Sequence, residues 1–466
     1  MKNYNLTEGN ILNKLLLVAL PIMGTQFIQM TYNMVDMIWL GRVGKDAVAS
    51  SGTAGLYMWL FMAFLLVGRM GSEIGVSQHL GKKDIKNAKE FSQNSLFISF
   101  ILGCLCSATC LLFSKQLISF FNIQEPIVAQ DSARFLSIVG LACPFTFVTA
   151  SLTGSFNGSG NSKLSFIANL SGLALNIALD PILIFFFHLG VIGAAIATAT
   201  AQTVVCIIFL VSIKKHKERP FSEYSFLIKP SLDKLIKIFK WTAPIAIESF
   251  LFSFFTMKIT SFVSRFGAGA ISVQSIGSQI ESLTWLIGGG YGSALTAFVG
   301  QNFGAKKWGR IHKGFKISIY VMSIWGVIVT LILFFGGKYI FYLFIPDDSL
   351  LNMGDNYLKI LAFCQLVGCL EAISSGTFRG TGRTIPPSLV SVISNFLRIP
   401  MAYFLSLTSL GLNGIWLGIT IGAFIRGAWI FIWRLIRSRK EPKHDLNENP
   451  EILCAKYEII HNLEDT

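Results

Sequence analysis

The segment Val76-Ser77-Gln78-His79-Leu80-Gly81 closes a long apolar stretch, and it returns in the second half of the chain as Val299-Gly300-Gln301-Asn302-Phe303-Gly304. The same offset aligns earlier landmarks without a gap from position 21 to position 81. Pro21 matches Pro244, Arg42 matches Arg265, and Gly44 matches Gly267. Chance similarity between apolar segments does not account for shared Pro, Arg, Gln and Gly landmarks, so we infer that the chain is a tandem repeat.

Beyond the repeated segment, the composition is that of a membrane protein. Of 466 residues, 52% are hydrophobic and only 14% are charged, with a mean hydropathy of +0.58, whereas soluble domains carry about 25% charged residues. Twelve spans of ~20 apolar residues with short loops use nearly this whole length. We expect an all-α integral membrane fold with spans at 12–40, 47–76, 91–113, 132–156, 162–187, 191–213, 236–263, 270–299, 315–336, 356–378, 385–408 and 411–434.

The repeat extends over the remaining spans. Residues 155–160 are mirrored by 377–382, and residues 189–193 by 410–414. Each copy therefore holds six spans, and an even number gives both copies the same topology, related by a pseudo-twofold axis along the membrane normal. This arrangement is typical of transporters whose site lies between the two lobes. We expect an N-terminal lobe at 1–213, a cytoplasmic linker at 214–235, a C-terminal lobe at 236–436 and a basic and polar tail at 437–466.

The position of the Lys and Arg residues explains the net charge of +14. They concentrate in every second loop counted from the N-terminus, in the linker and in the tail, which predicts that both termini are cytoplasmic. Because the charge is spread over short loops instead of one domain with interleaved aromatics, we expect no nucleic-acid partner. The first span is too long for a signal peptide, so we expect it to remain in the mature protein. We therefore expect a multi-pass protein of the plasma membrane.

Two motif searches narrow the classes of site. None of the eight Cys residues has a CxxC partner, so we expect neither a disulfide nor a zinc site. No GxxxxGK[ST] segment occurs, so the chain binds no nucleotide through a P-loop. We expect no cofactor and no enzymatic activity.

Polar residues inside spans are costly in a bilayer, and each is therefore a functional candidate. In the first span, Gln26, Gln29, Asn33 and Asp36 are spaced by three, four and three residues. This spacing places them on one helical face. We predict that this face lines a polar interior.

A second polar set lies in spans five and six. Asn176 and Asp180 are four residues apart and share one face, and Thr198 adds a hydroxyl oxygen. At 1.5 Å per residue, Asp36, Asp180 and Thr198 all lie ~8–11 Å below the outer surface of the membrane core, so they can meet. Carboxylate, amide and hydroxyl oxygens suit a hard monovalent cation, and paired carboxylates also hold a proton. We predict a site for Na⁺ or H⁺ here.

The repeat restricts this site to one lobe. The counterparts of Asp36, Asn176, Asp180 and Thr198 are Ile259, Arg398, Ala402 and Ile419. The acids at these positions are therefore found in the N-terminal lobe alone.

The second lobe has polar residues of its own. Glu248 lies in span seven, Gln279 and Glu281 in span eight, and Glu371 in span ten. Glu248 would attract a cationic drug or hold a second ion. The alternative is that these acids and the basic residues of neighbouring spans neutralise each other inside the lobe; those residues are Lys258, Arg398 and Arg426.

Short landmarks along the chain carry a family resemblance. They are Leu6-Thr7-Glu8-Gly9, Ala19-Leu20-Pro21, Asn33-Met34-Val35-Asp36, Gly41-Arg42-Val43-Gly44, the repeated segments 76–81 and 299–305, and the turn Gly158-x-Gly160. In this order, duplicated and at this spacing, they resemble the multidrug and toxic compound extrusion (MATE) family over roughly residues 6–436.

The resemblance implies roles for particular residues. The family's ion site, an Asp in span one, an Asn and an Asp four apart in span five and a Thr in span six, falls on Asp36, Asn176, Asp180 and Thr198. It also implies a hinge at Pro21 and, in some relatives, acids in spans seven and ten. Glu371 is in span ten, but its register against Arg379-Gly380 differs from that pattern.

We therefore expect a secondary active exporter that acts as a monomer. An amphipathic organic cation would bind between the lobes and leave as Na⁺ or H⁺ enters. A flippase for lipid-linked oligosaccharides is the nearest alternative. A membrane transferase would need a cytoplasmic DxxxD pair or a metal-spaced set of His residues, and this sequence has neither. It also has no filter motif of the kind that a channel would need.

Overall fold

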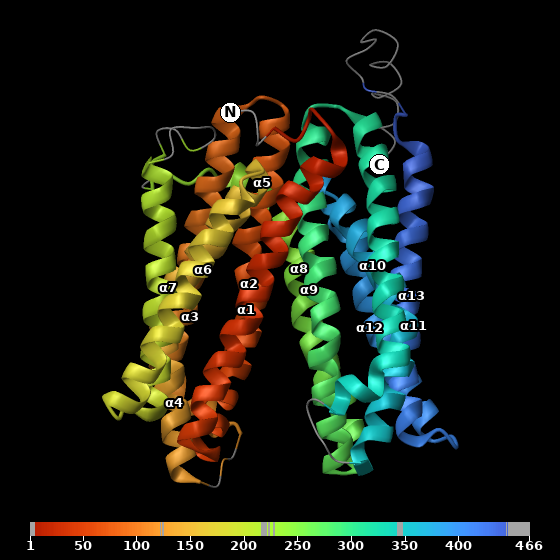
Figure 1. Ribbon diagram of the computed structural model, residues 1–466. Coiled ribbons are helices and arrows are strands. Elements are labelled where there is room, and N and C mark those ends of the chain that lie inside the picture. Colours follow the sequence, from red (N-terminus) through yellow and green to blue (C-terminus); the bar gives the residue numbers. More distant parts are fainter. Residues whose placement is uncertain are drawn as a thin grey trace.

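The computed structural model describes residues 5–121, 123, 125–215, 221, 224–226, 229–342, 348–443 and 445, and the elements that it describes are helices (Figure 1). The N-terminal half holds α1 Ile11–Val43, α2 Lys45–Gly81, α3 Ile85–Ser119, α4 Pro126–Leu141, α5 Cys143–Ser159, α6 Ser162–Pro181, the π-helix η1 Ile182–Phe186 and α7 Gly190–Lys215. The C-terminal half holds α8 Leu232–Val263, the short η2 Ser264–Phe266, α9 Ala268–Gly304, α10 Trp308–Tyr342, α11 Asp348–Gly380, α12 Ile385–Ser406 and α13 Gly411–Lys440.

The fourth predicted span is not one straight helix. The predicted span at 132–156 is formed by two helices, because α4 and α5 meet at Ala142 with a bend of 47°. Pro144 lies in the first turn of α5. It has no N–H to donate and disfavours the helical conformation of the residue before it, so a helix starts more easily here than it continues.

Helix α9 is the one predicted span that is not a candidate membrane-crossing helix within the part of the chain that the structure describes. Ten helices of the described residues are long and apolar enough to cross a membrane, and the bent pair α4–α5 adds another. Helix α9 is 37 residues long but carries Gln274, Gln279 and Glu281. It packs against α1, α2, α10 and α11 instead of facing lipid all round. The predicted twelve-helix fold is confirmed, and the chain is a multi-pass membrane protein.

The two halves form two lobes that repeat each other's local geometry. Helices α1–α7 and α8–α13 lie side by side, approach each other at the end that carries the start of α1 and the end of α13, and diverge toward the other end (Figure 1). We call these the terminal end and the far end. The turns after α5 and α11 are alike: Gly160 and Gly382 have φ of 88° and 80°, and Asn161 and Arg383 each donate a backbone N–H across the turn at 2.9 Å. Glycine tolerates this left-handed conformation at both positions.

Reciprocal contacts join the lobes at the terminal end. The Gln78 Nε2 of α2 donates to the Gly380 carbonyl at 3.0 Å, and the Gln301 Nε2 of α9 donates to the Gly158 carbonyl at 3.0 Å. Gly81 and Gly304 allow this approach, because a Cβ at either position would lie 1.9 Å from the carbonyl oxygen of the opposite Gln. The segment that reveals the repeat is thus also where the repeats meet.

The N-terminal arm, residues 5–10, crosses to the second lobe. Leu6 is completely buried, and its N–H donates to Gln301 Oε1 at 3.0 Å. Its carbonyl accepts from Asn302 Nδ2 at 3.2 Å, and the Thr7 carbonyl accepts from Lys307 Nζ at 2.9 Å. The N-terminal arm therefore belongs structurally to both lobes.

The described parts of the linker lie against α3, where Asp84 caps that helix. Tyr224 and Ser92 share a hydrogen bond of 2.9 Å, and the Ser231 N–H donates to Asn94 Oδ1 at 2.9 Å. The Asp84 carboxylate accepts from the Asn87 N–H and side chain at 3.1 and 2.7 Å, which lowers the pKa of that carboxyl. Helix α13 runs to Lys440, past the lobe end predicted at 436, and most of the predicted tail lies outside the described residues.

Candidate functional site

The four predicted ion-site side chains come together at the junction of three helices. Asp36 comes from α1, Asn176 and Asp180 from α6, and Thr198 from α7. The Asn176 Nδ2 donates to Asp180 Oδ1 at 3.2 Å, and the Thr198 hydroxyl donates to Asp36 Oδ2 at 3.2 Å. The two carboxyls lie within interaction range of each other. A polar cluster of four side chains thus forms within the N-terminal lobe.

Three oxygen atoms of this cluster are buried without a hydrogen-bond partner. They are Asp36 Oδ1, Asn176 Oδ1 and Asp180 Oδ2. Asn176 and Asp180 are both completely buried. Among the described residues, neither carboxyl forms an ion pair with Lys, Arg or His. Buried acceptors of this kind are costly unless something binds them, so the cluster has the chemistry of a site for a small cation.

The local sequence of α6 explains how Asp180 is placed. Pro181 follows it directly and has no N–H, so the regular α-helical hydrogen bonding ends there. The chain continues as the π-helix η1, in which the Phe187 N–H donates to the Ile182 carbonyl at 3.0 Å. π-Helical turns are often found at functional positions. Asp180 therefore lies at the junction of two helix types.

Two further polar residues near the lobe interior were not among the predicted site residues. The Tyr32 hydroxyl donates to the Thr198 carbonyl at 3.4 Å, and Tyr32 lies one turn before Asp36 on the same face of α1. The four-residue spacing between Tyr32 and Asp36 was the feature of the sequence that could have indicated this position. Glu73 is completely buried in α2, and its Oε1 accepts from the Ser293 hydroxyl of α9 at 2.7 Å. Its partner lies in the other lobe, so spacing along α2 gave no indication of it.

Comparison with known proteins identifies the family. The MatE family model matches residues 21–182 and again residues 244–404, which fall in the two lobes. The chain belongs to the MatE family. The two matched segments correspond to the tandem repeat, and the family resemblance inferred from the landmarks is confirmed.

Curated relatives of this MatE chain align over almost its whole length. A probable multidrug resistance protein NorM of Thermotoga maritima is 28% identical, covering 91% of this chain and 93% of its own. A probable multidrug resistance protein YoeA of Bacillus subtilis is 24% identical, covering 92% and 95%. The multidrug export protein MepA of Staphylococcus aureus is 25% identical, covering 94% and 96%.

Solved structures share the fold. A MATE crystal structure in a bent conformation superposes with a TM-score of 0.88 at 21% identity, covering 94% of this chain and 98% of that one. A MOP superfamily transporter from Pyrococcus furiosus superposes with a TM-score of 0.87 at 21% identity, covering 95% and 99%. These likenesses establish the two-lobe architecture of the MatE chain.

The polar stripe of α1 starts beside the contact between the lobes. Met23 and Met30 face α9: a Cβ at Gly290 would lie 2.8 Å from Met23 Cγ, and the Ser282 hydroxyl lies 4.0 Å from Met30 Sδ. Gln26 is partly buried there. Toward the far end, where the lobes diverge, Gln29 and Asn33 are exposed, whereas Asp36 is partly buried within the first lobe.

The acids of the second lobe lie apart from the N-terminal cluster and have their own partners. Glu371 Oε2 accepts from Arg426 Nε at 2.9 Å. Glu248 Oε2 accepts from the Ser388 hydroxyl at 2.8 Å and lies 3.8 Å from Arg379 Nη2.

The two predicted residues of α9, Gln279 and Glu281, lie in different surroundings. Trp285 Nε1 donates to Glu281 Oε1 at 3.0 Å, while Gln279 is exposed. Both lie on α9, which together with α8 forms the second lobe's side of the contact between the lobes.

Pro21, the predicted hinge, lies within an unbroken helix. Helix α1 continues through it, and the Thr25 hydroxyl donates to the Pro21 carbonyl at 2.9 Å. Such a bond to a backbone carbonyl can bend a helix. The hinge stays a prediction.

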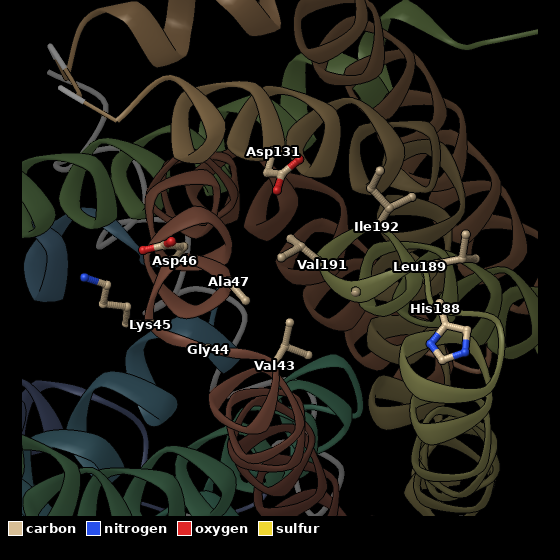
Figure 2. A pocket seen from close by; sticks show the side chains of 11 residues that line it. Val43, Gly44, Lys45, Asp46, Ala47, Asp131, His188, Leu189, Val191 and Ile192 are labelled. Carbon is tan, nitrogen blue, oxygen red and sulfur yellow. The ribbon is translucent and has the colours of Figure 1, made fainter.

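A cavity of about 350 Å³ opens at the far ends of the helices that carry the cluster (Figure 2). Val43 at the end of α1 and Val191 at the start of α7 line it, with Asp131 and the exposed His188 on opposite sides. At 1.5 Å per residue, Val43 lies about 10 Å beyond Asp36 along α1. In this MatE chain, a hollow at the surface thus lies close to the acidic cluster.

Proposed function

We propose that this chain is a secondary active multidrug exporter that exchanges Na⁺ or H⁺ for amphipathic organic cations by alternating access. The observation that carries the proposal is the convergence of Asp36, Asn176, Asp180 and Thr198 from three helices, with the hydrogen bonds given above. The names of the relatives, which describe multidrug resistance and export, support the same class of cargo. On this proposal the protein is a transporter and not an enzyme.

The coupling cation binds as cargo at the cluster. Two neighbouring carboxylates repel each other when both are charged, and a bound Na⁺ or a proton relieves that repulsion. Asp36 and Asp180 carry the charge, and Asn176 and Thr198 supply neutral oxygens. An all-oxygen set of this kind matches the ligand preference of hard cations.

Coupling requires that cation and drug favour opposite conformations. A ligand shifts a conformational equilibrium only by its difference in affinity for the two states. The drug binds between the lobes, beside the contact of α1 with α9, where exposed Gln29, Asn33 and Gln279 offer polar contacts. The reciprocal bonds of Gln78 and Gln301 keep the terminal end closed while the far end is open.

The cellular setting follows from the charge distribution. The protein is a monomer in the plasma membrane with both termini in the cytoplasm, so the terminal end faces the cytoplasm and the far end faces outward. Its partners are lipid and small cationic drugs, without nucleic acid or cofactor.

Transport assays in vesicles test the proposal. Uptake of a fluorescent cation into inverted vesicles is measured with a Na⁺ gradient alone and with a pH gradient alone. We expect one gradient to drive transport in the wild type and Asp36→Asn to abolish it. Asp233→Asn, which neutralises an exposed acid in the first turn of α8, is the matched control and keeps transport. Full activity of Asp36→Asn would disprove the ion site, and no response to either gradient would favour the flippase.

A further inference from the structure

The second lobe holds an arginine at a position where the polar cluster of the first lobe holds an amide. Arg398 of α12 is the repeat counterpart of Asn176, and α12 is the counterpart of α6. Its Nη1 donates to Asn395 Oδ1 at 2.7 Å. The facing helix makes room for it, because a Cβ at Gly422 of α13 would lie 2.1 Å from Arg398 Cγ. The fold therefore accommodates a permanent positive charge at this position.

Arg398 is joined to a second arginine and, through it, to an acid. The same Asn395 Oδ1 also accepts from Arg426 Nη1 at 3.4 Å. Arg426 Nε donates to Glu371 Oε2 at 2.9 Å, and these two side chains are only 8% and 15% exposed. Arg426 also lies over the Trp285 ring, with 5.2 Å to the ring centroid. The acid is thus compensated by a guanidinium fixed on several sides.

The other acids of this lobe also lie near arginines. Glu248 lies 3.8 Å from Arg379 Nη2. Glu281 and Arg398 lie within electrostatic range of each other. Guanidinium groups keep their proton in proteins, so this compensation does not depend on pH.

The first lobe has the opposite arrangement. Among the described residues, Asp36 and Asp180 have no ion pair with a basic side chain, and each has one buried oxygen without a partner. Burying charge is tolerated only when it is compensated. The second lobe therefore compensates its acids with its own arginine side chains, whereas the two acids of the first lobe must take the compensating charge from solution.

We propose that Arg379, Arg398 and Arg426 are built-in counter-ions that keep the acids of the second lobe permanently compensated, so that the exchangeable cation binds in the first lobe alone. This inference rests on the proposed function. It also means that Glu248 and Glu371 neither carry the coupling ion nor attract a cationic drug, because their negative charge is already compensated.

Cation binding to the purified chain in lipid nanodiscs tests the inference. Bound ²²Na⁺ is counted at fixed pH, and proton uptake is measured after a pH step in weakly buffered solution. We expect the wild type to bind one exchangeable cation and Asp36→Asn to bind none. Arg426→Gln leaves Glu371 without its counter-ion and gains a second cation, and the double variant Asp36→Asn with Arg426→Gln binds one.

Two variants control for charge and folding. Glu371→Gln combined with Arg426→Gln removes both partners, so it binds one cation, and Arg426→Lys keeps the charge and also binds one. If Asp36→Asn still binds a cation, and the further substitution Glu371→Gln removes that cation, the inference is overturned but the proposed function is not. A monodisperse Arg426→Gln variant that gains no cation has the same consequence. Binding and export that are both unchanged by Asp36→Asn would instead overturn the proposed function.

Discussion

Gln78 and Gln301 bind the opposite lobe in the same way: each side-chain amide donates to a glycine carbonyl across the interface, at 3.0 Å in both cases. The two residues are repeat counterparts, and so are their acceptors Gly380 and Gly158. A pair of bonds related by the pseudo-twofold axis therefore closes the terminal end. Because both bonds must break when the lobes separate there, they bear directly on the balance between conformations.

Gln78→Ala is expected to weaken the closed terminal end. It removes one cross-lobe bond and leaves the Gly380 carbonyl without this donor, which costs about 1–2 kcal/mol and shifts the equilibrium roughly 5- to 30-fold. Spin labels at Lys83 and Lys306, exposed residues just beyond α2 and α9, would report a larger population at long distance. Gln301→Ala should act in the same direction. An unchanged distance distribution in both variants would rule out this role.

Gly81→Ala is expected to prevent closure of the terminal end. Its Cβ would lie 1.9 Å from the Gln301 carbonyl oxygen, a distance that only a backbone shift can relieve. Transport should be lost while the protein is still produced, and the same spin labels should stay far apart. Gly55→Ala is the matched control, because a Cβ there meets nothing within 4 Å and alanine favours the helix. Transport near the wild-type rate in Gly81→Ala would contradict the packing described here.

Thr198→Val is expected to weaken binding of the coupling cation. It removes the hydroxyl that donates to Asp36 Oδ2 at 3.2 Å, together with one ligand oxygen, while keeping the side-chain shape. A loss of about 1–1.5 kcal/mol corresponds to a roughly tenfold higher half-saturating cation concentration for drug transport. Thr198→Ser keeps the hydroxyl and should stay near the wild-type value. Equal values for the two variants would show that the hydroxyl does not act on the cation.

Glu441→Gln is expected to destabilise the second lobe. Glu441 Oε2 accepts from Arg434 Nη1 at 2.8 Å, and the side chains are 6% and 1% exposed. Removing one partner of a buried pair costs about 3–5 kcal/mol, because the other charge stays buried. Thermal unfolding of the purified protein should show a clear drop in Tm. Replacing both residues, as Glu441→Gln with Arg434→Met, should cost less, and a larger drop in that double variant would contradict the explanation.

The helices and the convergence of the polar cluster were predictable because both follow from local patterns. Apolar runs and the repeat give twelve spans, and residue spacing with depth along three helices brings Asp36 to Asp180 and Thr198. The bend between α4 and α5 had a signal in Pro144, but a long apolar run conceals it, since hydropathy takes no account of a missing N–H. Helix α13 extends beyond the predicted apolar span at 411–434, because basic residues continue the helix past its apolar part.

Contacts between the lobes were beyond prediction for a different reason. The repeat shows that Gln78 and Gln301 are equivalent, but equivalence does not say what either touches. Gln78 bonds a residue 302 positions away, and Glu73 bonds one 220 positions away. Such partners are set by how two preformed lobes fit together, which depends on surfaces assembled from many helices.

The N-terminal arm has a consequence for the order of assembly during synthesis. Leu6 is made before its partner Gln301, which follows 295 positions later. At about 5–20 residues per second, the arm waits roughly 15–60 s before its binding surface exists. The first lobe can therefore insert early, but the terminal end can close only after α9 has been synthesised. Each newly made chain thus begins without its terminal seal, and completing the second lobe supplies it.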